Sequence, residues 1–108
     1  MAKKEKRGGF DRYVDQVFKK DPQLEMAYLA ELAEEPITTQ IAVLRHRLGL
    51  TQQQVAKRMR LKQSNVARLE RKGENPTAKM IGRAAKAMGC RVVLVPEKEL
   101  GRFISAGL

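Results

Sequence analysis

Two short stretches with the apolar spacing of helices, residues 51–59 and 63–71, are separated by a turn of three or four residues. Their apolar positions are Val55, Ala56, Met59, Val66 and Leu69. Helices of this length are marginal on their own in water, so each must bury its apolar stripe against its neighbour. The sequence therefore predicts two abutting helices joined by a tight turn.

Helix-boundary signals define the surrounding elements. Thr51 and Gln54 have the spacing of a capping box, in which a hydroxyl and an amide satisfy the first backbone donors of a helix. Three further helices have such signals at their ends. Their boundary residues are Asp21 and Pro22 for a helix at about 22–34, Pro36 and Gly49 for the next, and Thr77 and Gly89 for the last.

The stretch RVVLV, residues 91–95, is rich in β-branched residues and lies between Gly89 and Pro96, which predicts a strand. The expected fold class is thus all-α with one short C-terminal β-strand. A single strand forms no sheet by itself, so it needs a partner. That partner is the same strand of a second subunit or another chain; alternatively, the segment packs on the domain without pairing.

The charge of the chain is divided unevenly. Its formal net charge is +10, yet residues 1–36 hold seven Lys or Arg against eight Asp or Glu, and residues 37–108 hold 15 against four. Residues 45–72 contain nine basic residues and one acid, Glu70. This basic half has the charge expected of a surface that binds a polyanion, while a merely solvated basic surface is the plainer alternative.

Several classes of protein are disfavoured. A single histidine, His46, and a single cysteine, Cys90, provide neither a catalytic triad nor a CxxC metal site, and there is no Gly-rich phosphate loop. No enzyme activity, cofactor or metal is therefore expected. The N-terminus lacks the apolar segment of a secretory signal, and no apolar run approaches the ~20 residues of a membrane span, so a cytoplasmic protein is predicted.

The second of the paired helices carries amides where lysine and glutamate are the usual solvent-exposed residues. By periodicity its outward residues are Lys62, Gln63, Ser64, Asn65, Ala67 and Arg68. Gln and Asn can make two-point hydrogen bonds to adenine, and Arg to guanine, in the major groove of DNA. A basic RNA-binding protein is an alternative, but the aromatic residues that could stack on single-stranded bases lie mainly within residues 10–28, outside the basic segment.

The stretch GLTQQQVAKRMRLKQSNVARLERKGENPT resembles the helix-turn-helix of the Cro and phage-repressor class, the Xre family, and the similarity extends over about residues 38–95. The resemblance implies a sequence-specific transcriptional repressor that binds a palindromic DNA operator as a homodimer. The base-reading residues that it implies are Gln63, Ser64, Asn65 and Arg68. The phosphate-contacting residues expected beside them are Gln52, Lys57, Arg58, Arg60, Lys62, Arg71 and Lys72, of which Gln52 also braces the second helix.

Two positions depart from the pattern of the family. The turn between the two helices usually has glycine where this chain has Arg60, so a residue with a side chain must adopt a left-handed conformation there, with some strain. The second helix begins with Lys62 in place of a Ser or Thr cap. Because of these departures, the sequence leaves two alternatives for the first residue of the base-reading helix, one position apart.

The N-terminal pattern DPQLEMAYLAELAEE, followed by ITTQIAVLRHRLGLTQ, is similar to the HigA-type antitoxins. The resemblance implies a small basic ribonuclease toxin as partner, and a complex that represses its own operon. The toxin-facing residues expected, mostly acids suited to a basic partner, are Glu25, Tyr28, Glu31, Glu34 and Glu35. A stand-alone Xre-family regulator with no toxin has the same features and is the alternative.

The length of 108 residues suits one domain with short appendages. Its expected parts are a flexible basic arm at 1–9, an N-terminal helical extension at 10–35, the helix-turn-helix domain with its terminal strand at 36–96, and a tail at 97–108. The extension begins with an apolar stripe at helical spacing, formed by Phe10, Tyr13, Val14, Val17 and Phe18.

Overall fold

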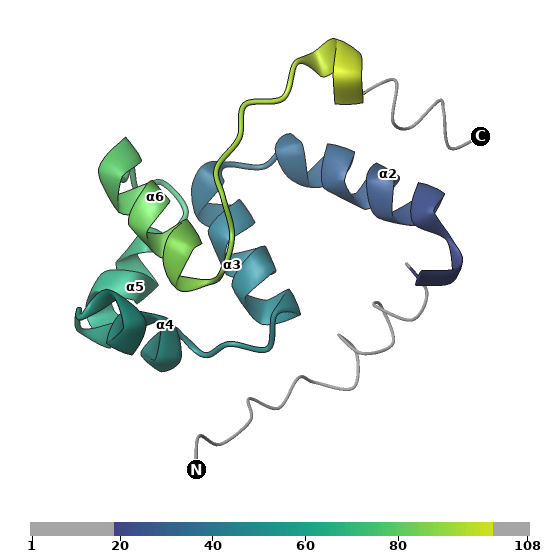
Figure 1. Ribbon diagram of the computed structural model, residues 1–108. Coiled ribbons are helices and arrows are strands. Elements are labelled where there is room, and N and C mark those ends of the chain that lie inside the picture. Colours follow the sequence, from purple (N-terminus) through teal and green to yellow (C-terminus); the bar gives the residue numbers. More distant parts are fainter. Residues whose placement is uncertain (1–18, 101–108) are drawn as a thin grey trace.

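The computed structural model describes residues 19–100, and this part of the chain is all-α (Figure 1). The helices with defined bounds are α2 Pro22–Ala33, α3 Ile37–Arg47, α4 Gln52–Met59, α5 Gln63–Leu69 and α6 Ala78–Ala87. A further helical turn covers residues 97–100. The predicted arm at 1–9, the apolar stripe at 10–18 and the last part of the tail, 101–108, lie outside the described residues. None of the described helices is long and apolar enough to cross a bilayer.

One apolar core joins α3, α4, α5 and α6. Its buried members are Ile41, Leu50, Val55, Ala56, Met59, Val66, Leu69, Ala84 and Met88. Every inward position predicted for α4 and α5 is among them. Two helices of eight and seven residues have little stability of their own, so burial of these stripes is what holds them in place.

The predicted starts of α2, α4 and α6 are confirmed by side-chain capping bonds. The Thr51 hydroxyl accepts a bond of 3.0 Å from the Gln54 amide, and the Gln54 side chain accepts one of 2.7 Å from the Thr51 amide, which completes the capping box of α4. Asp21 caps α2 and Thr77 caps α6 through their side-chain oxygens. Each of these bonds satisfies a backbone donor that a helix leaves open in its first turn.

The turn between α4 and α5 contains the left-handed residue that was expected. Arg60 has φ 58° and ψ 42°, and no other described non-glycine residue has a positive φ. Its amide bonds to the Lys57 carbonyl at 3.1 Å, and the Leu61 amide bonds to the Ala56 carbonyl at 2.9 Å, which closes the end of α4. A left-handed residue with a side chain costs roughly 1–2 kcal/mol, so the surrounding packing has to offset that strain.

Helix α2 lies on the other side of α3 from α4 and α5 (Figure 1). Leu32 is buried, whereas Leu24 and Leu29 on the same helix are exposed. The Gln40 side chain donates a hydrogen bond of 2.9 Å to the Glu35 carbonyl and so ties α3 to the end of α2. The extension is therefore less deeply packed than the helices of the core.

The predicted β-strand at residues 91–95 is not formed, and this expectation was wrong. The segment has no regular secondary structure, and its apolar side chains at 92–95 are exposed, that of Leu94 to 95%. β-branched residues favour an extended backbone, but a strand exists only through hydrogen bonds to a second strand. The rest of the described chain, residues 19–90 and 96–100, provides no strand with which it could pair.

Candidate nucleic-acid interface

The outward face of α5 is open to solvent. Lys62, Gln63, Ser64 and Asn65 are all exposed, and so is Arg68 one turn later, whereas Val66 and Leu69 are buried and Ala67 is half-buried. The orientation predicted from periodicity is therefore confirmed. Amide, hydroxyl and guanidinium groups on one exposed face provide the donors and acceptors required to read base edges.

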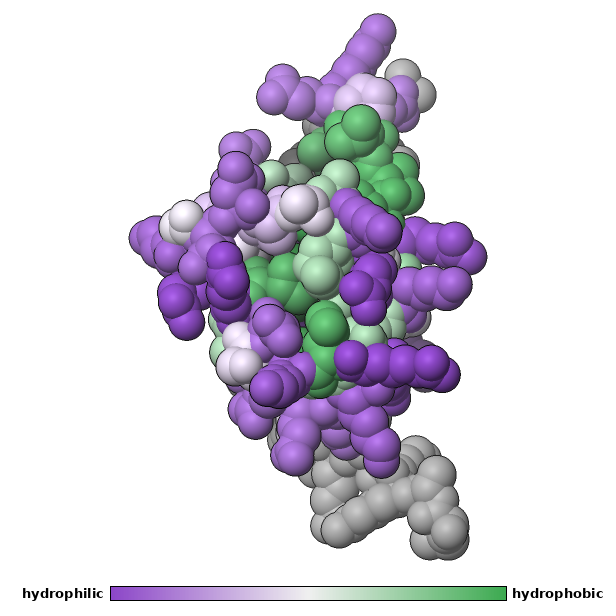
Figure 2. Space-filling model, turned by 90° about the vertical axis from the view of Figure 1, so that its left-hand side faces the viewer, coloured by the Kyte–Doolittle hydropathy of each residue, from purple (hydrophilic) through white to green (hydrophobic). Residues whose placement is uncertain are grey.

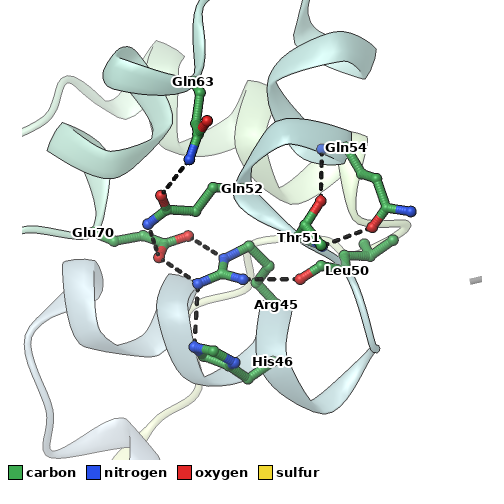
Figure 3. A network of polar contacts seen from close by, with 8 residues as sticks. All are labelled: Arg45, His46, Leu50, Thr51, Gln52, Gln54, Gln63 and Glu70. Carbon is green, nitrogen blue, oxygen red and sulfur yellow. Dashed lines mark hydrogen bonds and ion pairs between the residues drawn. The ribbon is translucent and has the colours of Figure 1, made fainter. Parts of the chain in front are cut away.

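A buried ion pair lies behind this face and joins α3 to the residue that ends α5 (Figure 3). Arg45 donates from Nε to Glu70 Oε2 at 2.6 Å and from Nη2 to Glu70 Oε1 at 2.9 Å, and the two side chains are 8% and 6% exposed. Arg45 Nη1 also donates to the Leu50 carbonyl at 2.8 Å, and Nη2 lies 3.2 Å from His46 Nε2. The two-point geometry meets the requirement that buried charges be both paired and hydrogen-bonded.

The Glu70 carboxylate also begins a chain of hydrogen bonds that reaches the outward face of α5. Gln52 donates from Nε2 to Glu70 Oε1 at 3.1 Å, and Gln63 donates a long bond of 3.5 Å from Nε2 to Gln52 Oε1 (Figure 3). Gln52 is half-buried at the first residue of α4, and Gln63 is exposed at the first residue of α5. The bond to Glu70 restricts the rotamers of Gln52, and the longer bond directs the exposed Gln63 amide toward Gln52.

Sequence reasoning missed the ion pair of Arg45 and Glu70, because it counted the former among the basic residues that meet a polyanion. The pairing removes Arg45 from that set and leaves eight of the nine basic residues of segment 45–72. Two signals could have found it. Arg45 follows Ile41 by four residues on the inward stripe of α3, where an unpaired charge is costly, and Glu70 is the one acid of the segment.

Most of the residues predicted to contact phosphate have exposed side chains. The exposed ones are Lys57, Arg58, Arg60, Lys62, Arg71 and Lys72, whereas Gln52 is half-buried. Arg58 donates from Nη1 to the Ala87 carbonyl at 3.0 Å, so its guanidinium is directed at the end of α6. The contacts of all seven residues with phosphate stay a prediction.

A second acid lies beside the outward face, in the loop after α5. Glu74 Oε2 accepts a bond of 3.5 Å from Arg68 Nε, and Glu74 Oε1 lies 3.7 Å from Arg71 Nη1. The two arginine side chains are 69% and 65% exposed, and that of Glu74 is 29% exposed. Arg68, Glu74 and Asn65 border a hollow of about 240 Å³ next to α5.

The residues predicted to face a protein partner lie on α2 and just after it. Glu31, Glu34 and Glu35 are exposed, whereas the side chain of Glu25 lies outside the described residues. Tyr28 is half-buried, and the guanidinium carbon of Arg47 lies 5.4 Å from the centre of its ring, within the range of a cation–π contact. Part of the ring is therefore already engaged within the chain.

Hydrophilic side chains dominate the side of the molecule on which α5 and α6 lie, with smaller hydrophobic patches between them (Figure 2). Within residues 19–100, no group of three or more His, Cys, Asp or Glu residues could hold a metal ion. The exposed polar residues of α5 and α6 suit a ligand with many acceptors: Gln63, Ser64, Asn65, Arg68, Lys79, Arg83 and Lys86.

The middle of the chain matches a known family. Residues 41–95 match the family model described as helix-turn-helix, and they make up about half of the chain. The match includes α4, the turn at Arg60, α5 and α6. No curated protein and no solved structure matches the chain at a significant level.

Proposed function

The chain belongs to the helix-turn-helix family of the Xre and Cro type, which binds DNA sequence-specifically, and on this premise we propose that it is a transcriptional repressor acting as a homodimer on a palindromic operator. The observation that carries the proposal is the open face of α5, which bears amides and an arginine. Val66 and Leu69 pack the opposite face into the core, so the helix can be presented rigidly to a major groove.

Four residues form the proposed base-reading set: Gln63, Ser64, Asn65 and Arg68. Gln63 is suited to adenine, whose major-groove edge offers a donor and an acceptor, and Arg68 is suited to the two acceptors of guanine. The contact from Gln63 to Gln52 supports this assignment, because it directs the amide from a partner that is itself bonded to the buried Glu70. The proposed phosphate contacts are the seven predicted from the sequence; among them, Arg58 has to release the Ala87 carbonyl first.

Alanine substitutions at the base-reading positions test this function. The wild-type chain is first used to select a binding duplex from random-sequence DNA. Gln63→Ala, Ser64→Ala and Arg68→Ala should then each reduce discrimination at one base pair by about 1–3 kcal/mol. Lys98→Ala, at an exposed basic residue of the last helical turn, is the matched control. Unchanged preference in all three variants, or failure of the wild type to select any sequence, contradicts the proposal.

The proposed dimer contact is the exposed apolar segment 92–95. It borders an apolar groove of about 690 Å³, whose other walls come from α2, α3, α6 and Leu100. Burial of apolar surface contributes roughly 25 cal/mol per Å², and a second copy supplies a matching apolar surface with the two-fold symmetry that a palindrome requires. This contact needs no strand pairing.

Sedimentation equilibrium tests the dimer contact. The wild type and Lys98→Ala should sediment as dimers, and Leu94→Lys as a monomer with weaker operator binding. Leu94 is almost fully exposed in the single chain, so the substitution leaves the fold of the monomer intact. A dimer of Leu94→Lys as stable as the wild type contradicts the assignment of this segment.

A second role is favoured by the acids at the end of α2. We propose that the chain is also the antitoxin of a type II pair that neutralises a small basic ribonuclease and represses its own operon. Glu31, Glu34 and Glu35 are exposed and opposite in charge to such a partner. Because α2 and α5 lie on opposite sides of α3 (Figure 1), a partner bound to α2 leaves the DNA-binding face free.

Co-expression with the product of the neighbouring reading frame tests this second role. A basic product of roughly 100 residues should co-purify with the wild type and be lost from the variant E31K/E34K/E35K, which should still bind the operator. Glu97→Lys, an exposed acid on the last helical turn, is the control. If no such frame is adjacent, or if the triple variant retains the product, the chain is a stand-alone regulator.

A further inference from the structure

We propose that Ala67 is a further base-reading residue, whose methyl group contacts the C5 methyl group of a thymine in the operator. The contact makes the protein prefer thymine to cytosine at that base pair. The proposal rests on the proposed function, because it takes the outward face of α5 to be the surface that lies in the major groove. It concerns an apolar side chain that the base-reading and phosphate-contacting sets do not include.

The neighbours of Ala67 place it on the outward side of α5. Residues three and four apart lie on the same face of a helix, so Ala67 lies beside Ser64 and Gln63, and both of these are exposed. Val66 and Leu69 pack into the core on the other side of the helix. Ala67 is itself half-buried, so part of it is open to a ligand.

The major groove of DNA offers such a side chain one apolar partner. Among the four bases, only thymine carries a methyl group at C5, and this group projects into the major groove. Alanine recognises thymine by apolar contact with that methyl group. The proposed contacts of Gln63, Ser64 and Arg68 are hydrogen bonds, so a methyl contact adds sequence information that they do not supply.

The spacing of α5 indicates which thymine is meant. Cβ atoms four residues apart on a helix are separated by about 5–6 Å, and successive base pairs by about 3.4 Å. The thymine should therefore lie within about two base pairs of the pair that Gln63 reads.

The size of the expected effect follows from the burial of a single methyl group. This contributes about 0.8 kcal/mol, which is close to 4-fold in affinity. Alanine has no side-chain rotamers to lose, so Ala67 pays no ordering cost that would reduce this contribution.

Removal of the methyl group from the DNA tests the proposal without any change to the protein. The wild type first selects a duplex from random-sequence DNA, and Gln63→Ala identifies the base pair that Gln63 reads. Each thymine of one half-site is then replaced in turn by deoxyuridine, which lacks only the C5 methyl group. One replacement within about two base pairs of the Gln63 pair should weaken binding by about 3–5-fold.

Removal of the methyl group from the protein completes a double-mutant cycle. For each protein, the affinity for the thymine duplex is divided by that for the deoxyuridine duplex, and the folded fraction of the protein cancels in this ratio. Ala67→Gly should lower the ratio from about 3–5 to below about 1.5. Ala42→Gly is the matched control, because Ala42 is also a half-buried residue within a helix, α3, and lies outside the DNA-contacting sets. It should leave the ratio unchanged.

A second variant replaces Ala67→Gly if the glycine prevents folding. Ala67→Ser costs a helix less than glycine does, and it places a hydroxyl group beside the thymine methyl, so it should also lower the ratio.

Three results overturn the proposal. The first is a selected duplex with no thymine in that range, and the second is a wild type whose binding no deoxyuridine in that range weakens. The third is an equal ratio in the wild type and the folded Ala67 variant, because the thymine methyl then contacts another residue. A wild type that selects no sequence overturns the proposed function itself, which is a separate result.

Discussion

Helices α4 and α5 are neighbours of nearly equal length, but they are held by different means. α4 begins with the complete capping box of Thr51 and Gln54 and ends at the left-handed Arg60. Arg83 of α6 donates from Nη2 to the Met59 carbonyl at 2.9 Å and adds a bond at the same end. The bounds of α4 are therefore set largely by residues within or next to the helix.

α5 has no comparable local support at its start. Its N-cap, Lys62, makes no side-chain capping bond. Glu70, which follows the last helical residue, is instead anchored by Arg45, 25 residues earlier in the chain. α5 is thus held in place by this ion pair and by the packing of Val66 and Leu69, whereas α4 is held by its caps.

The difference teaches how a helix can present its first turn to a ligand. A side chain that caps its own helix is directed at the backbone and cannot also extend outward. Lys62 leaves the first donors of α5 without a side-chain partner and keeps its ammonium group free for a phosphate, as proposed. The other end of α5 is instead fixed in place by the buried ion pair of Arg45 and Glu70.

The largest expected loss of stability comes from breaking the ion pair between Arg45 and Glu70, which anchors the end of α5. Glu70→Gln leaves the buried guanidinium of Arg45 without its counter-charge, so the free energy of unfolding should fall by about 3–5 kcal/mol. Chemical denaturation measures this, with the exposed Glu97→Gln as control. A loss below about 1 kcal/mol, the range of surface pairs, contradicts a buried, structure-bearing pair.

Removal of the N-cap of α4 should lower the free energy of unfolding by less than removal of the ion pair. Thr51→Ala deletes the hydroxyl that accepts from the Gln54 amide and should lower the free energy of unfolding by about 1 kcal/mol. Operator affinity, extrapolated to fully folded protein, should change little, because the base-reading helix is untouched. If Thr51→Ala costs as much as Glu70→Gln, the contrast between the two helices does not hold.

Relief of the strained turn should stabilise the chain. Arg60→Gly removes the clash of a side chain at φ 58°, and after the entropy of glycine in the unfolded state is counted, the gain should be about 0.5–1 kcal/mol. Thermal unfolding should show a higher midpoint. Arg60→Ala, which keeps the strain, is the matched control and should show no such gain.

The smallest expected change in the free energy of unfolding comes from adding an N-cap to α5, which α4 already has. Lys62→Ser should raise the free energy of unfolding by about 0.5 kcal/mol, because serine can accept from an amide of the first turn. The same variant should lose about one unit of salt slope on DNA, as expected for one lost phosphate contact. A stabilised variant with an unchanged slope would remove Lys62 from the phosphate-contacting set.

Local signals predicted most of the fold and the orientation of the site. The capping box and the outward face of α5 each follow from residues within a few positions of one another, whereas the left-handed residue at Arg60 was expected from the resemblance to the helix-turn-helix family. The ion pair of Arg45 and Glu70 was missed because its partners are remote in sequence. The strand at 91–95 was wrong for a related reason, since local preference cannot supply the second strand that a ladder requires.

The chain of contacts from Glu70 through Gln52 to Gln63 has a practical consequence for anyone who wishes to redirect the protein to new operators. Replacement of Gln63 removes its bond to Gln52, so libraries randomised there change the base-reading side chain and the surroundings of Gln52 together. Ser64 and Asn65 are solvent-exposed and stand outside that chain of bonds. Substitutions at these two positions should change the DNA sequence that the helix prefers and leave the fold unchanged.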